Sequence, residues 1–145
     1  LSGYKEALKE YGIPYDESLV HFHELNKENT LESCSALFSS KRVPDAIIAC
    51  NDTAARAVLE FARNQGIQVP EQLKVTGYAN DSRAEISRPQ ITSVEQFPYL
   101  MGEGAAKLIM DLIEANEHNS RSYITLTTPV ELISRDSSNK ALKEG

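Results

Sequence analysis

The sequence predicts an α/β fold in which helices flank a parallel β-sheet. Short apolar runs typical of buried strands alternate along the chain with longer segments whose apolar residues recur at helical spacing. The clearest example is residues 44–66, where the apolar run 46–50 leads directly into an amphipathic helix that ends near Gly66. Strands that alternate with helices in this way form βαβ units, and right-handed crossovers join such units into a parallel sheet.

The predicted elements around this unit follow from caps and apolar spacing. Ser2 can cap a first helix, which Gly12 closes. Residues 19–22 are predicted to form a short strand and residues 30–38 a second helix. The strand at 46–50 should be buried on both faces, as in the middle of a parallel sheet. Residues 73–78 alternate in polarity and form the third predicted strand.

The second half of the chain is less regular. Residues 82–89 are predicted as a loop or short helix, and residues 91–96 as an extended segment. A helix with one broad apolar stripe follows at about 100–115. Residues 123–128 form a further predicted strand that Pro129 breaks, 130–133 resume it, and 140–145 should fray.

Length and charge narrow the functional classes. At 145 residues the chain can bury one substantial core, and its net charge of −6 argues against a nucleic-acid-binding face on this chain. No apolar run approaches the ~20 residues that span a bilayer, and no signal-peptide pattern opens the chain. Because the sequence begins with Leu-Ser-Gly-Tyr and not with Met, we expect a fragment of a longer protein.

The residues do not point to a metal, a cofactor or an enzyme. Cys34 and Cys50 are the only cysteines and match no motif spacing, so we expect two buried free thiols of a reduced compartment and no disulfide. His21 and His23 share one face of a predicted strand but lack a third ligand at a convincing spacing. The chain has no glycine-rich phosphate loop, no nucleophile elbow and no Cys-His arrangement, so we predict no catalytic residues.

Polar pairs follow two of the predicted strands. Asn51 and Asp52 come directly after the strand at 46–50, at the edge of an open α/β sheet where ligands commonly bind. The same pair could be only a helix cap, a role that fits Asp52 better than Asn51. Asn80 and Asp81 follow the third strand and are equally compatible with a plain turn or with ligand contact.

Six short motifs, in this order and spacing, resemble the C-terminal part of the effector-binding domain of the LacI/GalR family. They cover nearly the whole chain: Leu1-Ser-Gly-Tyr-Lys-Glu-Ala-Leu, Pro44-Asp-Ala-Ile-Ile-Ala-Cys-Asn-Asp, Gly66-Ile-Gln-Val-Pro-Glu-Gln-Leu-Lys-Val-Thr-Gly-Tyr, Pro89-Gln-Ile-Thr-Ser-Val-Glu-Gln, Met101-Gly102, and Glu131-Leu-Ile-Ser-Arg-Asp-Ser. The resemblance implies a periplasmic-binding-protein-like fold of two α/β lobes with a small-molecule cleft between them. Residues 1–92 would belong to the C-terminal lobe. Residues 93–129 would cross to the N-terminal lobe, 130–136 would return, and 137–145 would be a frayed tail.

The resemblance also implies which residues bind the effector. The family asparagine that contacts sugar hydroxyls matches Asn51, and the family glutamine at the crossing matches Gln96. The family aspartate of the cleft falls on Ala79, so only Asn80 or Asp81 could replace it. The stacking aromatic of the family aligns near a leucine, Leu25. Expected ligand-binding residues are therefore Asn51, Gln96, Asn80 and Asp81.

Two functions remain open at this point. The first is the small-molecule-sensing domain of a cytoplasmic transcriptional regulator, with a sugar or related metabolite as effector, a homodimeric state, and DNA bound through a head domain absent from this chain. The second is a periplasmic or extracellular solute-binding protein of a transport system on the same fold. Free thiols and the motifs at 69–72 and 133–137 favour the regulator. Neither function involves insertion of this chain into a membrane.

Overall fold

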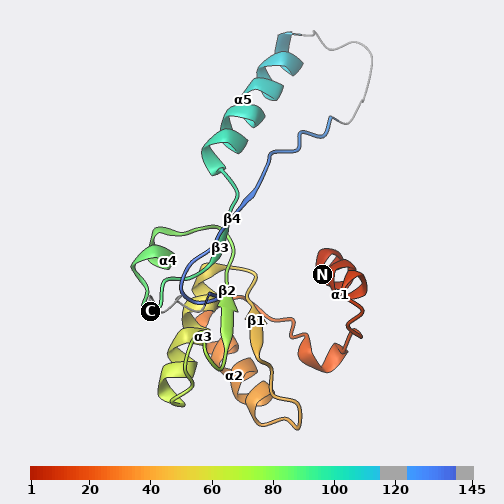
Figure 1. Ribbon diagram of the computed structural model, residues 1–145. Coiled ribbons are helices and arrows are strands. Elements are labelled where there is room, and N and C mark those ends of the chain that lie inside the picture. The colour runs from red at the N-terminus through yellow and green to blue at the C-terminus, as the bar shows by residue number, and fades with distance from the viewer. Residues whose placement is uncertain (115–123, 140–145) are drawn as a thin grey trace, which may run out of the picture.

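The computed structural model describes residues 1–114 and 124–139, and it confirms the predicted α/β fold (Figure 1). The elements in chain order are α1 (Ser2–Glu10), the 3-10 helix η1 (Glu17–Leu19), α2 (Lys27–Phe38), β1 (Ala46–Ile48), α3 (Asp52–Asn64), β2 (Lys74–Thr76), α4 (Ser82–Ile86), β3 (Ser93–Glu95), α5 (Pro98–Glu114) and β4 (Glu131–Ile133). β1 pairs with β2 in parallel, and β3 pairs with β4 antiparallel. A parallel bridge between Thr76 and Thr92 joins β2 to the segment that enters β3.

The core is built around α3, the helix predicted from the amphipathic run after residue 50. Its apolar side chains recur at helical spacing and are buried against the sheet, where Leu73 and Val75 are fully buried. On its other side α3 packs against α2, and the rings of Phe38 and Phe61 meet with centroids 5.2 Å apart. Gly66 follows the helix at φ +70, a left-handed conformation that glycine adopts without strain.

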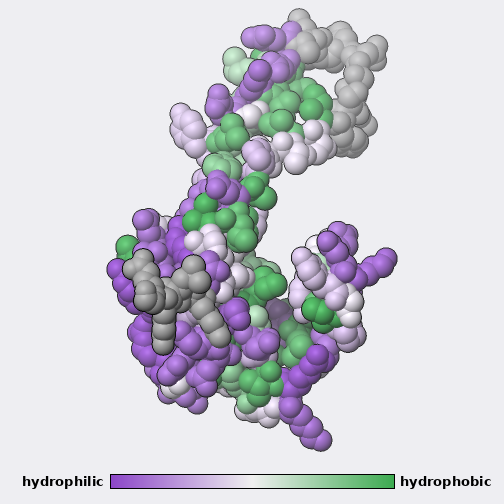
Figure 2. Space-filling model, viewed as in Figure 1, coloured by the Kyte–Doolittle hydropathy of each residue, from purple (hydrophilic) through white to green (hydrophobic). Residues whose placement is uncertain are grey.

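Two chain segments connect α5 to the part of the structure formed by α2, α3, β1 and β2, which we call the body. Figure 1 shows α5 standing apart from α2, α3 and the parallel strands, reached through β3 and linked back through the segment that enters β4. Apolar side chains gather along α5 and the returning segment (Figure 2), and several are more than half exposed: Ile109, Met110, Leu112, Ile113, Ile124 and Leu126. We call the antiparallel pair β3 and β4 the hinge ribbon. No helix in the described ranges is both long and apolar enough to cross a bilayer.

Several local predictions from the sequence are wrong at the N-terminal side. Ser2 does not cap α1, because Leu1 occupies the cap position and no side chain caps that helix. The helix predicted from residue 30 begins earlier, at Lys27, because the Asn26 side chain accepts a hydrogen bond from the Asn29 N–H, 2.9 Å away. Residues 19–22 do not form a strand: Leu19 ends η1, and residues 20–22 have no regular secondary structure.

The burial predicted for the first parallel strand is also wrong. Ile47 of β1 packs against the core, but Ile48 points to the opposite face of the sheet and is 66% exposed. Cys50, predicted to be buried, is exposed, whereas Cys34 is buried as predicted. Both are free thiols.

The C-terminal predictions are mixed. The strand expected at 123–128 is absent over 124–128, which have no regular structure, and residue 123 lies outside the described part. The resumed strand is confirmed as β4. The tail expected to fray from 137 does not begin there: Ser137 is fully buried, and its Oγ donates to the Val75 carbonyl oxygen at 2.6 Å. Residues 140–145 lie outside the described ranges.

Candidate functional site

The predicted site residues follow three strand segments whose carboxyl ends lie side by side. The Ala49 N–H donates to the Thr76 carbonyl at 2.9 Å, and the Gly77 N–H donates to the Thr92 carbonyl at 2.8 Å. The chain that leaves β1, β2 and β3 therefore emerges at one edge, which we call the carboxyl edge. It carries the four predicted residues, all of them half-buried: Asn51, Asn80, Asp81 and Gln96.

Asn51 is the N-cap of α3. Its Oδ1 accepts a hydrogen bond from the Ala54 N–H at 2.7 Å, which satisfies one of the free amides in the first turn. Its Nδ2 donates to the Leu25 carbonyl at 3.3 Å, so the segment before α2 also reaches this edge. The expectation that Asp52 is the better cap is wrong. One amide hydrogen and one lone pair of Asn51 are left for another partner.

Asp52 instead forms a buried junction between three segments. Only 2% of its surface is exposed; Oδ1 accepts from the Ser93 hydroxyl and Oδ2 from the Asp81 N–H, each at 2.7 Å. Gly77 lies directly against this group, and a Cβ there would overlap Asp52 Oδ1. Asp52 thus holds α3, β3 and the turn after β2 together, and it requires glycine at position 77.

Asn80 lies in a turn that bends sharply after β2. Ala79 and Asn80 both have positive φ, +97 and +49, and the Ala79 N–H donates to the Val94 carbonyl at 3.0 Å. The Asn80 Nδ2 donates to Glu95 Oε2 at 2.9 Å, and its Oδ1 accepts from Arg135 Nη2 at 2.8 Å. Both polar ends of the side chain are therefore engaged within the chain.

Glu95 and Arg135 were not predicted as site residues. The Glu95 carboxyl also accepts from the Phe97 N–H at 2.7 Å. Hydrogen bonds from Asn80 and from that N–H favour the ionised form, so they lower the pKa of the Glu95 carboxyl. Arg135 Nη1 donates to the Ile91 carbonyl at 2.8 Å. Their only signal in the sequence is that they fall inside two of the family-like motifs.

Asp81 caps α4 and pairs with Arg83. Its Oδ1 accepts from the Arg83 N–H at 2.8 Å, and the guanidinium meets both carboxyl oxygens. The hydrogen bonds from Arg83 hold the pKa of the Asp81 carboxyl well below its usual range. Gln96, by contrast, has no side-chain hydrogen bond to any described residue, which leaves its amide the least committed polar group at the carboxyl edge.

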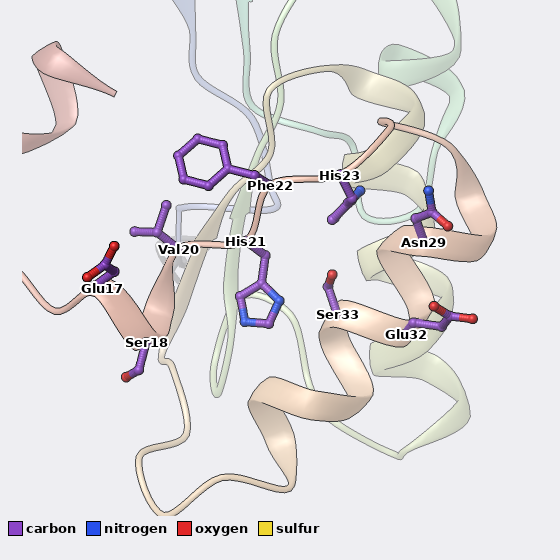
Figure 3. Close-up of a pocket in the computed structure, with 9 residues that line it drawn as sticks. All are labelled: Glu17, Ser18, Val20, His21, Phe22, His23, Asn29, Glu32 and Ser33. Atoms are coloured by element: carbon purple, nitrogen blue, oxygen red, sulfur yellow. The ribbon is translucent and has the colours of Figure 1, made fainter.

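The two histidines line a different, open pocket of about 530 Å³ between the segment 17–23 and α2 (Figure 3). His21 projects toward Ser33 of α2, and His23 Nδ1 lies 2.8 Å from the Glu24 carbonyl oxygen. Within the described residues no three acidic, histidine or cysteine side chains cluster in a way that could hold a metal. None of the four predicted site residues lines this pocket.

Comparison with known proteins identifies the fold family. The model of the periplasmic binding protein-like domain matches residues 1–138. The chain belongs to this family. It is 36% identical over 113 residues to the HTH-type transcriptional regulator CelR of Thermobifida fusca, an alignment covering 78% of the chain and 33% of CelR. It is 32% identical over 139 residues to the HTH-type transcriptional regulator DegA of Bacillus subtilis, covering 96% of the chain and 40% of DegA.

Solved structures of transcriptional regulators have the same fold as this chain. A complex of the transcriptional regulator CelR with cellobiose superposes with a TM-score of 0.85 at 32% identity, covering 94% of the chain and 41% of that structure. The regulator CcpA of Lactococcus lactis superposes with a TM-score of 0.82 at 28% identity, covering 94% of the chain and 49% of that structure. The chain is thus a periplasmic-binding-protein-like domain of the LacI/GalR type, as its motifs suggested. It spans well under half the length of the curated relatives that it matches.

These relatives also help to choose between a transcriptional regulator and a solute-binding protein of a transport system. They are transcriptional regulators, which favours a ligand-sensing regulatory domain over a solute receptor of a transport system. Regulators of this kind are generally not enzymes.

Proposed function

We propose that this chain is part of the effector-sensing unit of a cytoplasmic, homodimeric transcriptional regulator whose DNA-binding head lies outside it. The family match and the regulator relatives support the general role. The cellobiose bound to one structural neighbour supports a sugar or related metabolite as the effector class.

The effector would bind at the carboxyl edge, to Asn51 and Gln96, with Asn80 and Asp81 as further candidates. The observation that carries this proposal is that these half-buried polar groups follow adjacent strands at the point where the hinge ribbon leaves the body. Primary amides both donate and accept, which suits the hydroxyl groups of a sugar. Gln96 offers the most, because neither polar atom of its side-chain amide is used by a described residue.

Binding would be read out as a change of interlobe orientation. The proposed lobe boundaries are 1–92 for the C-terminal lobe, 93–129 for the crossing segments and 130–136 for the return. A ligand that contacts both lobes favours one orientation over the other by its difference in affinity for the two. The DNA-binding heads of the dimer would report that shift as altered operator affinity.

The test is a thermal-stability screen of the intact regulator against disaccharides including cellobiose, sugar phosphates and nucleobases. A ligand at one hundred times its dissociation constant should stabilise the protein by ~2.7 kcal/mol. Gln96→Ala should abolish the shift. Asn51→Ser should weaken it while keeping the cap of α3, because serine also caps helices well.

Two results would count against the proposal. A ligand whose stabilisation survives both substitutions would bind elsewhere. A ligand that stabilises the regulator but leaves its operator affinity unchanged would separate binding at this edge from regulation. Glu71→Gln, in the exposed turn before β2 and so at the opposite end of that strand from this edge, is the matched control for a change of one polar side chain.

A further inference from the structure

The hinge ribbon enters and leaves the body beside Asn80. In its ladder Ser93 faces Ile133, Val94 faces Leu132, and Glu95 faces Glu131. The pair next to α5 therefore sets two carboxylates opposite each other, an arrangement that destabilises an antiparallel ribbon. The ribbon needs another contact to hold its orientation at this end.

Asn80 provides that contact to Glu95, and it also holds the chain that leaves the returning strand. Its Nδ2 donates to Glu95 at the end of the outgoing β3, and its Oδ1 accepts from Arg135, two residues beyond the returning β4. The Arg135 backbone is itself tied to the body, since its N–H donates to Thr92 Oγ1 at 2.8 Å and Nη1 donates to the Ile91 carbonyl. One amide side chain thus links the end of β3 to the segment that follows β4.

The bridge continues into the turn that aims α5. The second oxygen of Glu95 accepts from the Phe97 N–H at 2.7 Å, and Phe97 has φ +50, a left-handed conformation that is unfavourable for a bulky side chain. The Phe97 carbonyl then accepts from the Met101 N–H at 3.0 Å in the first turn of α5. Hydrogen bonds therefore run without a break from Asn80 through Glu95 and Phe97 to the base of that helix.

We infer that Asn80 is a positioning residue that clamps the hinge ribbon and fixes the orientation of α5, and not primarily an effector contact. The inference rests on the proposed function for its regulatory meaning: an effector at the neighbouring Gln96 would act on a hinge whose resting orientation Asn80 sets. Its structural part, the clamp, can be measured without any effector.

The test is a distance distribution between two spin labels in the intact regulator without effector. One label is placed at Glu71→Cys, in the exposed turn before β2, and the other at Glu103→Cys on the exposed side of α5, in a Cys50→Ser background. The buried Cys34 is expected to stay unlabelled. Asn80→Gly removes both bridging bonds while keeping the positive φ accessible. Arg83→Ala is the matched control, because it breaks a neighbouring ion pair that does not reach the ribbon.

We expect a narrow distance peak within each protomer for the wild type and for Arg83→Ala, and a broadened or shifted peak for Asn80→Gly. Glu95→Gln is the second variant, because its NH₂ group replaces one of the two accepting oxygens and then faces a donor, either the Asn80 amide or the Phe97 N–H; it should broaden the distribution as well. An unchanged distribution in both variants would overturn the clamp. That result would leave the effector screen unaffected, whereas a failed screen would leave the distances unaffected, so the two proposals fail separately.

Discussion

The buried carboxyl group of Asp52 gives the sharpest test of how the carboxyl edge is held together. Each of its oxygens accepts one hydrogen bond, from the Ser93 hydroxyl and from the Asp81 N–H. Asp52→Asn keeps the size of the side chain but replaces one acceptor by an NH₂ group. In either orientation of the new amide, its NH₂ group faces either the Ser93 hydroxyl or the Asp81 N–H, both of which donate to Asp52 in the wild type. One buried donor therefore loses its acceptor.

The cost follows from that lost bond. A buried donor left without an acceptor costs about 1–3 kcal/mol, and bonds to charged groups lie toward the upper end. We therefore expect Asp52→Asn to lower the free energy of unfolding by about 2 kcal/mol. Asp52→Ala removes both bonds and should cost more, roughly 3–5 kcal/mol when the cavity is included. Against a total of about 5–15 kcal/mol for a typical domain, both changes are large.

Urea unfolding of the intact regulator domain measures these differences. The m-value should stay constant, so that a lower midpoint reports stability and not a change in exposed surface. Glu71→Gln removes an exposed carboxylate and should stay within about 0.5 kcal/mol of the wild type. An Asp52→Asn protein as stable as that control would refute the view that this junction holds α3, β3 and the turn together.

Three further results are expected. Gly77→Ala should destabilise the domain by a comparable amount, because the new Cβ overlaps the Asp52 carboxyl group and stands 3.2 Å from a helix side chain; unfolding of the purified variant checks this. A thiol reagent at pH 8 should modify the exposed Cys50 quickly and Cys34 only on unfolding, since burial raises the pKa of the Cys34 thiol to about 11. Hydrogen bonds from Arg83 lower the pKa of Asp81 in the folded state, so the pairing stabilises α4 fully at pH values above the ordinary Asp pKa and is lost only as the pH falls through the lowered pKa. An NMR titration should find Asp81 still ionised at about pH 3, and a midpoint at the ordinary Asp pKa would contradict this expectation.

The parts of the fold that were predictable are those with local causes. The unit at 44–66 could be predicted because its apolar period and its closing glycine are local signals, although the capping role was assigned to the wrong member of the Asn51-Asp52 pair. The parallel pairing of β1 with β2 follows from the general rule for βαβ units. The exposure of Ile48 and Cys50 could not be predicted, because burial of a strand depends on neighbours that its own sequence does not specify.

The site was predictable only in outline. Asn51, Asn80, Asp81 and Gln96 do follow the carboxyl ends of adjacent strands, as strand order implies. What the sequence did not reveal is which of their atoms are already used. Asn80 meets Glu95 and Arg135, which are 15 and 55 residues away, and such distant pairs leave no periodic or spacing signal.

Ala79 lies in the sharp turn after β2, between the carboxyl edge and β3. The resemblance places the family's cleft aspartate at this position, and alanine at φ +97 pays a backbone cost of order 1–3 kcal/mol without a polar side chain to offset it. The turn persists because its backbone is held from β3, by the Val94 carbonyl and by Ser93 Oγ, which accepts from the Asn80 N–H at 3.0 Å. Loss of the aspartate therefore removes an acceptor from the edge without removing the turn that presented it. Since Asp81 and Glu95 are both engaged by the chain, we expect an effector here to rely on amide contacts more than on a carboxylate.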